Sequence, residues 1–266
     1  MSGLVEFLQA DGTVVEVRIT EVRGSSPREA GAFLLVCGAR IWGTVGGGQL
    51  EYMALDEARK LARSDGSVAE MNVPLGPEIG QCCGGRVRLD LRILDAADKA
   101  RLLAEEAARV AALPEVLILG AGHVGRALAY AFAPLPVRVT LIDSRAEELA
   151  RAPKGIEQIC TPLPEAKLRA AGAGAAYIVA THEHSLDFLL TQEALARGDA
   201  AYVGMIGSQT KRAKFESWAV GPTEALMCPM AAANKGDRRP EVIAAFVVAE
   251  VMTALAKSPA KETADE

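Results

Sequence analysis

The chain has 266 residues, of which 50% are hydrophobic, and its formal net charge is −5. This length can bury two modest cores, so two domains are expected. The acidic balance is unlike that of nucleic-acid-binding proteins, the first residues lack the basic start of a secretory signal, and no uncharged apolar run is long enough to cross a membrane. We therefore expect a cytoplasmic protein without a membrane or nucleic-acid partner.

The chain has five cysteines, an odd number, at positions 37, 82, 83, 160 and 228. A chain of this size without an export signal is expected to keep its thiols reduced, which disfavours a disulfide framework. The sequence contains no Cys-x-x-Cys pair, so it gives no support for a structural zinc site.

Residues 1–95 predict a small α+β domain. Segments rich in β-branched and apolar residues predict strands, and one segment with helical spacing predicts a helix over 49–64. The predicted strands lie at 13–24, 31–37, 40–45 and 86–94. An Ala-rich, charged stretch without proline then predicts a helical connector over 96–113, which Pro114 ends.

Residues 114–258 alternate between predicted strands and predicted helices, an order typical of a parallel sheet flanked by helices. The predicted strands lie at 115–120, 137–143, 175–180, 200–207 and 225–229, and the last helix begins at Pro240. We expect a Rossmann-like domain here, followed by a flexible tail over 259–266.

A glycine loop follows the first of these strands and begins a helix. Gly120, Gly122 and Gly125 match the pattern G-x-G-x-x-G. The first glycine permits a tight turn, the second lets backbone approach a pyrophosphate, and the third lets helix and strand pack closely. Asp143 ends the next strand, near the spacing of about 20 residues expected for a ribose-binding acid. A Rossmann-like fold that binds no dinucleotide is the alternative.

A second candidate anion site lies at the predicted start of a later helix. Ser208 has the chemistry of an N-cap, which places Lys211 and Arg212 in the first helical turn. Cations are unfavourable at this end of a helix dipole, so a nearby phosphate or acidic partner would explain them. Side chains that simply point into water explain them equally well.

His182 and His184 follow a strand at the edge where open α/β sheets bind ligands. They could ligate a metal, but no third ligand is evident. A polar loop that contacts substrate or an interface is the better interpretation.

Three glycine-rich loops, 24–31, 43–48 and 76–85, lie in the predicted N-terminal domain. Such runs cost entropy and are tolerated where backbone approaches backbone or a ligand, and their N–H groups can form an anion-binding nest. Simple tight turns are the alternative, and Glu51 at the helix start is explained by the dipole alone. The candidate ligand-binding residues are Gly24, Ser25, Arg28, Gly46, Gly47, Gly48, Gly84 and Gly85.

Cys82 and Cys83 are adjacent within the third loop. A disulfide between them is opposed by a reducing cytoplasm, and adjacent residues are awkward as two ligands of one tetrahedral zinc. A reactive thiolate, favoured by neighbouring N–H groups and Arg86, is possible, as is plain packing. We favour a functional role for at least one of the two thiols.

These motifs together resemble the XdhC/CoxI family of xanthine dehydrogenase accessory proteins. The resemblance rests on VRGSSPREAG, GTVGGGQLE, GPEIGQCCGG, LILGAGHVGRAL, LIDSR, THEHSLD and YVGMIGSQTKRAKF, in that order. It implies a homodimeric chaperone, rather than a turnover enzyme, that binds the molybdenum cofactor as molybdopterin or its dinucleotide. It also implies two partners, a cysteine desulfurase that supplies sulfur and the apo molybdenum hydroxylase that receives the cofactor. With such a cargo, Cys82 or Cys83 would contact the metal or relay the sulfur.

One loop departs from the family pattern. Cys228 and Pro229 are present, but Ala231 stands where the family has glycine, which hinders a positive φ.

Two other functions stay open. The glycine loop and Asp143 are compatible with an NAD(P)-dependent oxidoreductase, although no catalytic Lys/Asp or Tyr-x-x-x-Lys arrangement accompanies them. The paired thiols are compatible with a sulfur-transfer protein that needs no nucleotide.

Overall fold

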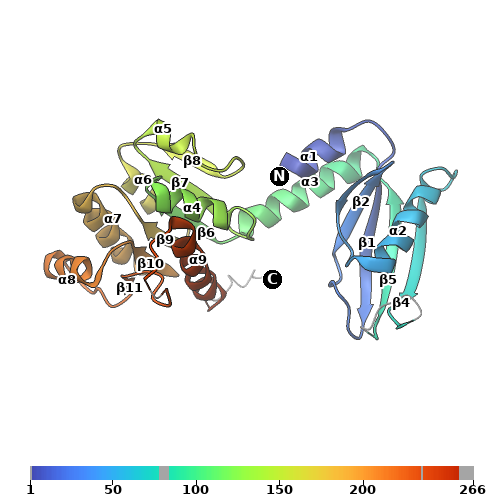
Figure 1. Ribbon diagram of the computed structural model, residues 1–266. Helices are drawn as coiled ribbons and strands as arrows, with labels where there is room; N and C mark the ends of the chain where they lie inside the picture. The colour runs from blue at the N-terminus through green and yellow to red at the C-terminus, as the bar shows by residue number, and fades with distance from the viewer. Residues whose placement is uncertain (1, 78–83, 235, 258–266) are drawn as a thin grey trace, which may run out of the picture. The chain divides into compact units, whose positions relative to one another are not determined.

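The computed structural model describes residues 2–77, 84–234 and 236–257 (Figure 1). The chain forms two compact units, Met1–Ala108 and Arg109–Glu266. The boundary falls inside helix α3 (Ala96–Ala112), which occupies the residues expected to form the helical connector. The tail predicted over 259–266 and the pair Cys82–Cys83 lie outside the described residues.

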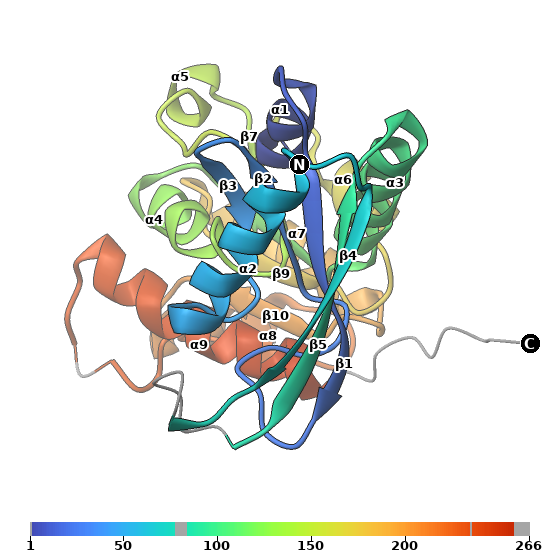
Figure 2. The same cartoon turned by 90° about the vertical axis from the view of Figure 1, so that its right-hand side faces the viewer.

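The N-terminal unit contains a five-stranded antiparallel sheet in the order β3-β2-β1-β5-β4. The strands are β1 (Val15–Arg23), β2 (Phe33–Cys37), β3 (Arg40–Gly43), β4 (Val68–Pro74) and β5 (Arg86–Ile93). Helix α2 (Gly48–Leu61) packs along one face of the sheet, as Figure 2 shows. Helices α1 (Ser2–Gln9) and α3 supply Leu4 and Leu102 to a second apolar cluster.

Alternation along β2 explains why the N-terminal sheet is covered on both faces. Leu34 and Val36 belong to the core beneath α2, whereas Leu35 and Cys37 belong to the cluster with α1 and α3. Successive side chains of a strand point to opposite faces, so an unbroken apolar run such as β2 requires a cover on each side.

The C-terminal unit contains a six-stranded parallel sheet in the order β11-β10-β9-β6-β7-β8. The strands are β6 (Glu115–Leu119), β7 (Arg138–Asp143), β8 (Glu157–Cys160), β9 (Ala176–Val179), β10 (Tyr202–Met205) and β11 (Leu226–Met227). Counted along the chain this is the Rossmann order 3-2-1-4-5-6, which reverses direction between β6 and β9. The predicted fold class, a Rossmann-like domain preceded by a smaller α+β domain, is confirmed.

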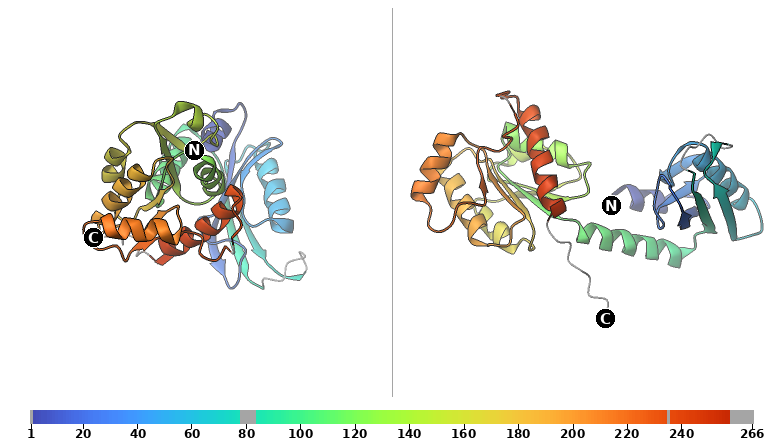
Figure 3. Two further views of the ribbon diagram at one scale, coloured as in Figure 1. Left: turned by 60° about the vertical axis from the view of Figure 1, so that its left-hand side comes forward. Right: turned by 90° about the horizontal axis from the view of Figure 1, so that it is seen from below.

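Helices cover both faces of the parallel sheet (Figures 1 and 3). Helices α4 (His123–Phe132) and α9 (Pro240–Lys257) pack on the face that contains Val116 and Ile118, where Leu149 of α5 (Ala146–Leu149) also lies. Helices α6 (Pro164–Ala170), α7 (His184–Ala196) and α8 (Gln209–Trp218) pack on the face that contains Leu117 and Leu119. Within the described residues, no helix has the length and apolarity needed to cross a bilayer.

Four elements were not assigned from the sequence: α1, β4, β8 and α6. Strand β8 has only four residues and is largely exposed, so it has no apolar pattern to detect. Strand β4 is an edge strand with a single fully buried residue, Val73. Both strands form because a neighbouring strand offers backbone hydrogen-bond partners, which is a tertiary effect that local sequence does not contain.

Candidate functional site

In the glycine loop between β6 and α4, the surroundings of the missing Cβ differ from one glycine to the next. A Cβ at Gly120, whose φ is 115°, would lie 2.3 Å from the carbonyl oxygen of Ala180. A Cβ at Gly125 would lie 1.8 Å from the carbonyl oxygen of Gly120. A Cβ at Gly122 would meet nothing within 4 Å. The first and third glycines are therefore required by the fold, and the second leaves open space beside the start of the helix.

Helix α4 begins after Gly122 without a side-chain cap and without an acidic residue in its first turn. Its first N–H groups and its dipole therefore have no carboxylate from the helix itself to balance them. This is the usual chemistry of a phosphate-binding helix start. His123 is exposed at this position.

Asp143 joins the end of β7 to the glycine loop. Its Oδ2 accepts hydrogen bonds from the Ala121 N–H at 2.7 Å and from the Arg145 guanidinium at 2.9 Å. Its Oδ1 accepts from the backbone N–H and from Nε of Arg145, both at 2.9 Å. Burial raises the pKa of this carboxyl, but the Arg145 and Ala121 donors outweigh burial and lower the pKa to about 2.

These contacts occupy the acceptor capacity of Asp143. A carboxylate offers about four lone-pair positions, and four protein donors already use them. A ribose diol can reach this carboxylate only by displacing Arg145. The arrangement therefore differs from the free acid that the glycine motif predicts for an NAD site.

A cavity of about 280 Å³ opens beside Asp143 at the carboxyl ends of the strands. Gly120, Thr181, His182 and Glu183 also line it. It lies where β6 and β9 diverge, which is the ligand-binding position of open α/β sheets. The sequence-predicted residues Gly120, Asp143 and His182 are thus brought together.

The basic residues at the start of α8 have protein partners. The Lys211 ammonium forms an ion pair with Asp187, whose side chain is 1% exposed, and donates to the carbonyl oxygen of Ile206 at 2.9 Å. Asp187 also accepts from the N–H and hydroxyl of Thr181, at 2.9 and 2.7 Å. The cation at this helix end is explained by a buried acid of the protein itself.

Arg212 donates to Glu216 at 2.7 Å and to the carbonyl oxygen of Cys228 at 3.2 Å. It therefore contributes to the attachment of the loop after β11 and is not free for a ligand in this arrangement.

Asp187 lies within THEHSLD but was not singled out from the sequence. A buried acid in the first turn of α7, followed by a lysine at the start of the next helix, was the available signal.

His182 and His184 are both exposed. Among the residues that the structure describes, no group of three or more His, Cys, Asp or Glu side chains is arranged to hold a metal ion.

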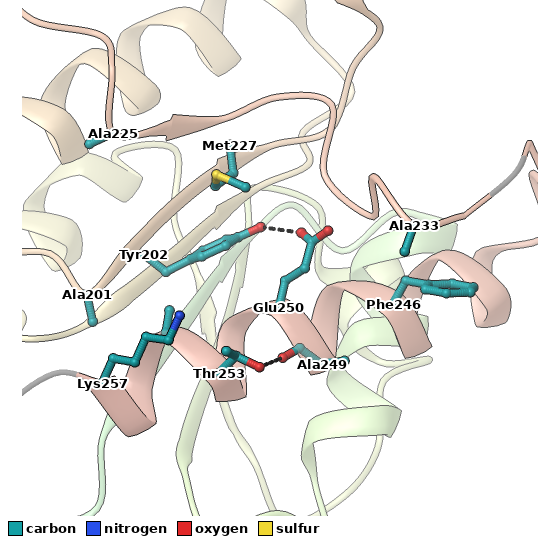
Figure 4. A pocket seen from close by; sticks show the side chains of 11 residues that line it. Ala201, Tyr202, Ala225, Met227, Ala233, Phe246, Ala249, Glu250, Thr253 and Lys257 are labelled. Carbon is teal, nitrogen blue, oxygen red and sulfur yellow. Dashed lines mark hydrogen bonds between the residues drawn. The ribbon is translucent and has the colours of Figure 1, made fainter.

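Glu250 of α9 holds the loop after β11. It accepts hydrogen bonds from the N–H groups of Ala231 and Ala232, at 3.1 and 2.9 Å, and from the Tyr202 hydroxyl at 3.1 Å. Figure 4 shows this carboxylate, with its bond to Tyr202, among the side chains that line a largely apolar cavity of about 710 Å³; Phe246 is another. Burial and the Glu250 charge raise the pKa of Tyr202, so its hydroxyl stays a donor. The acid within this apolar helix therefore has a structural role.

Ala231 has a φ of 59° and is buried. The backbone at this position is thus in the left-handed region, where alanine is strained and glycine is not. The conformation predicted for the loop is present even though the glycine is absent.

The three glycine-rich loops of the N-terminal unit meet at one end of its sheet. Ser25 forms an isolated β-bridge with Gly84. A Cβ at Gly85 would lie 2.1 Å from the Ser25 carbonyl oxygen, and a Cβ at Gly46 would lie 2.6 Å from Cγ of Pro27. Loop 24–31 therefore packs through its backbone on Gly84 and Gly85 and through the Pro27 ring on Gly46, so these residues of the three loops form one surface.

The loop over 43–48 already contains a carboxylate. Oε2 of Glu51 accepts from the Thr44 hydroxyl at 2.5 Å, the Val45 N–H at 3.3 Å and the Gly47 N–H at 3.2 Å. The predicted nest is therefore occupied by an acid from α2, and Gly48 begins that helix with a φ of 61°.

Arg28 lies on the same surface and is exposed. Its backbone N–H reaches the Ser26 hydroxyl at 3.4 Å, whereas its guanidinium has no partner among the described residues. Gly84, which follows Cys83 in the chain, is bridged to Ser25 three residues before Arg28. An available guanidinium thus lies near the point where the chain leaves the cysteine pair.

Family models match segments in both units of the chain. Residues 116–251 match the family model described as the XdhC Rossmann domain, and residues 7–71 match the model of the XdhC and CoxI family. The uncharacterized protein YqeB of Escherichia coli (strain K12) is 27% identical over 138 residues, which are 50% of this chain and 22% of that protein. The chain thus spans about a fifth of that relative's length.

Among solved structures, a xanthine dehydrogenase from Bacillus halodurans is similar over 100% of this chain and 97% of its own, with a TM-score of 0.79 and 17% identity. This likeness shows the fold. The NAD(P)-binding domain of an exopolyphosphatase-related protein from Archaeoglobus fulgidus aligns over 45% of this chain and 91% of its own with a TM-score of 0.35 and 15% identity, and supports no inference.

The charge on Asp143 is expected to stabilise the C-terminal unit in a pH-dependent way. Its folded pKa of about 2 lies below the usual 3.8, so its contribution is complete above about pH 4 to 5 and declines as the pH falls toward 2. Asp143→Asn should cost about 2 kcal/mol at neutral pH and progressively less in acid. Urea unfolding followed by Trp218 fluorescence, with Trp42 replaced by Phe, measures this. The exposed Asp90→Asn is the control, and a pH-independent difference for Asp143→Asn would contradict the account.

The Lys211–Asp187 pair is expected to matter because its acid is buried. Lys211→Met should destabilise the C-terminal unit by about 3 kcal/mol, since the carboxylate then loses its partner. Lys167→Met, which removes a lysine paired with the exposed Glu157, should cost less than about 1 kcal/mol. Adding Asp187→Leu to Lys211→Met should recover part of the loss in urea unfolding. Equal effects of the two lysine substitutions would be evidence against a buried pair.

The strain at Ala231 can be measured directly. Ala231→Gly should raise the unfolding free energy by about 1 kcal/mol, because glycine adopts the observed φ without a Cβ clash. Ala232→Gly, at the exposed next position, should lower stability slightly because only the unfolded-state entropy changes. The same direction of change for both substitutions would show that Ala231 is not strained.

Proposed function

Because this chain belongs to the XdhC and CoxI family, we propose that it binds the molybdenum cofactor and supports its sulfuration and insertion into a xanthine dehydrogenase-type molybdenum hydroxylase. In this role the cofactor is cargo that the protein passes on. We propose molybdopterin or its dinucleotide as the cargo, a cysteine desulfurase as the sulfur donor, and a cytoplasmic homodimer as the working form.

The observation that carries the proposal is that loops 24–31 and 43–48 lie together with Gly84 and Gly85, the residues that follow Cys83 in the chain. Gly24 and Gly85 lie where backbone packs against backbone, and Gly46 lies against the Pro27 ring, so none of the three positions has room for a side chain. Arg28 adds an exposed guanidinium suited to an oxyanion. We assign Cys82 and Cys83 the sulfur or metal contact, since thiolates are the protein ligands that a soft metal centre favours.

The glycine loop of the Rossmann-like domain is the second recognition element. Gly122 leaves open space beside N–H groups that no acidic residue of the first turn of α4 balances, which suits a phosphate or diphosphate of the cofactor. Lys211 and Arg212 are omitted from the proposed contacts because Asp187 and Glu216 already pair with them.

The alternative, an NAD(P)-dependent oxidoreductase, is less well supported. Its ribose-binding acid would be Asp143, and that carboxylate accepts four hydrogen bonds from the protein. A nucleotide without a ribose contact at this position remains compatible with the glycine loop.

The cofactor can be assayed on the purified protein. The chain is produced in a host that makes molybdenum cofactor, purified without oxygen, and analysed for bound pterin and molybdenum. We expect both to be present and to fall by about tenfold in Cys82→Ala/Cys83→Ala, since two charge-assisted or thiolate contacts are lost. Cys160→Ala, which removes an exposed thiol elsewhere, should leave both unchanged.

Arg28→Ala should also lower the cofactor content, whereas Arg88→Ala, an arginine paired with Glu70, should not. In a coupled assay the cysteine variants should lower client sulfuration while folding stays intact. Absence of pterin and molybdenum, together with failure to take up free cofactor, would reject the proposal. Tight NAD(H) binding with a substrate-dependent absorbance change would favour the oxidoreductase.

A further inference from the structure

A cavity lies in the N-terminal unit, at the end of the sheet opposite to the glycine-rich loops. It has a volume of about 700 Å³ and lies between the end of α2 and the hairpin turn that joins β2 to β3. The register places this turn beside the start of β1, because Val15 pairs with Val36, whereas loop 24–31 follows the other end of β1. The cavity is therefore separate from the surface that loop 24–31 forms with Gly84 and Gly85.

Three arginines from two parts of the chain line this cavity. Arg40 comes from the start of β3, and Arg59 and Arg63 come from the last turn of α2 and the residue after its cap. The single carboxylate among the lining residues is that of the exposed Asp11. The lining thus has an excess of positive charge in a chain whose net charge is −5.

None of these guanidiniums has a carboxylate partner within the described residues. Arg59 donates Nε to the Gly38 carbonyl oxygen at 3.3 Å, which leaves its two terminal nitrogens available. Arg40 lies over the Phe7 ring at 5.0 Å and makes one long contact of 3.4 Å to the Phe7 carbonyl oxygen. The Arg63 guanidinium has no described partner.

Five other arginines of the same unit are paired with acids. Their ion pairs link Arg18 to Glu16 and Glu105, Arg23 to Glu21, Arg88 to Glu70, Arg92 to Asp98 and Arg101 to Glu105. Acidic residues are thus available, yet the three arginines around this cavity have none. The negative end of the α2 dipole explains a cation at Arg59, but it does not explain Arg40 on a hairpin. Like charges at positions 59 and 63, one helical turn apart, repel each other unless an anion lies between them.

The floor of the cavity contains Cys37, whose side chain is almost buried and whose Sγ lies 3.5 Å from the Asp11 carbonyl oxygen. Val36 and Ala62 give the cavity apolar walls. A concave site with apolar walls and a few converging charges is typical of small-molecule binding, and guanidiniums match phosphate geometry.

We propose that this cavity is a second anion site, which binds a phosphorylated small molecule carrying at least two negative charges through Arg40, Arg59 and Arg63. The site needs neither the cysteine pair nor the Rossmann glycine loop, so it stands independently of the function proposed above.

Calorimetry on the full chain, with inorganic pyrophosphate as the probe at low ionic strength, tests the proposal. Arg59→Gln/Arg63→Gln should weaken pyrophosphate binding by about tenfold or more, because two charge-assisted contacts are lost. Arg88→Gln/Arg92→Gln removes the same charge from arginines with acidic partners and should change binding by less than about twofold. Added salt should weaken binding in the parent protein.

Alkylation of Cys37 locates the bound anion. Trypsin releases residues 29–40 as a peptide in which Cys37 is the sole cysteine, so mass spectrometry follows this thiol alone. Pyrophosphate should slow its alkylation in the parent and not in Arg59→Gln/Arg63→Gln. Failure of the parent to bind pyrophosphate, or equal affinity in the parent and Arg59→Gln/Arg63→Gln, would overturn the proposal whatever the reactivity of Cys37.

Discussion

The hydrogen bond from the Ala121 N–H to Asp143 connects the glycine loop to the acid at the end of β7, the two features that define the Rossmann-like motif. It ties the glycine loop after β6 to the end of β7, and Gly120 reinforces the same junction by donating its N–H to the Ile142 carbonyl oxygen at 2.7 Å. Arg145 neutralises the buried carboxylate, so the charge is retained without an external partner. The glycine loop is therefore held in place by the protein itself, and a loop that is already ordered lowers the cost of binding a ligand there.

Carboxylates hold backbone N–H groups at three further loops. Glu51 accepts from Val45 and Gly47, Asp187 accepts from Thr181, and Glu250 accepts from Ala231 and Ala232. In each case an acid on a helix fixes a loop at the end of a strand, where buried N–H groups would otherwise lack partners. Donors that a ligand could use are consequently fewer than the glycine content suggests, and the start of α4 is the clearest that remains.

The sequence predicted those parts of the structure whose causes are local. Gly125 is required by a contact with Gly120 inside one strand–loop–helix unit, so the glycine spacing predicts this part of the fold. The contact of Gly120 with the Ala180 carbonyl oxygen comes from the end of β9 and is not local. The partner of Lys211 is Asp187, 24 residues away on another helix, and no local pattern pairs them. For the same reason the anion inferred beside Lys211 turns out to be a carboxylate of the chain. Strand β8 was missed because it owes its existence to the edge of β7 and not to its own residues.

Basic residues that are paired with an acid of the protein stabilise the fold, whereas unpaired ones can bind a ligand. Lys211, Arg212 and Arg145 stand at strand ends, where sequence reasoning expects ligand contacts, yet each is neutralised by an acid of the same unit. Arg28 and the arginines around Cys37 are equally basic and have no such acid among the described residues. In a chain with more acids than bases, an unpaired guanidinium keeps its full attraction for an anion from solution. The N-terminal unit therefore carries the unpaired positive charge that attracts anions, although the recognisable nucleotide motif lies in the C-terminal unit.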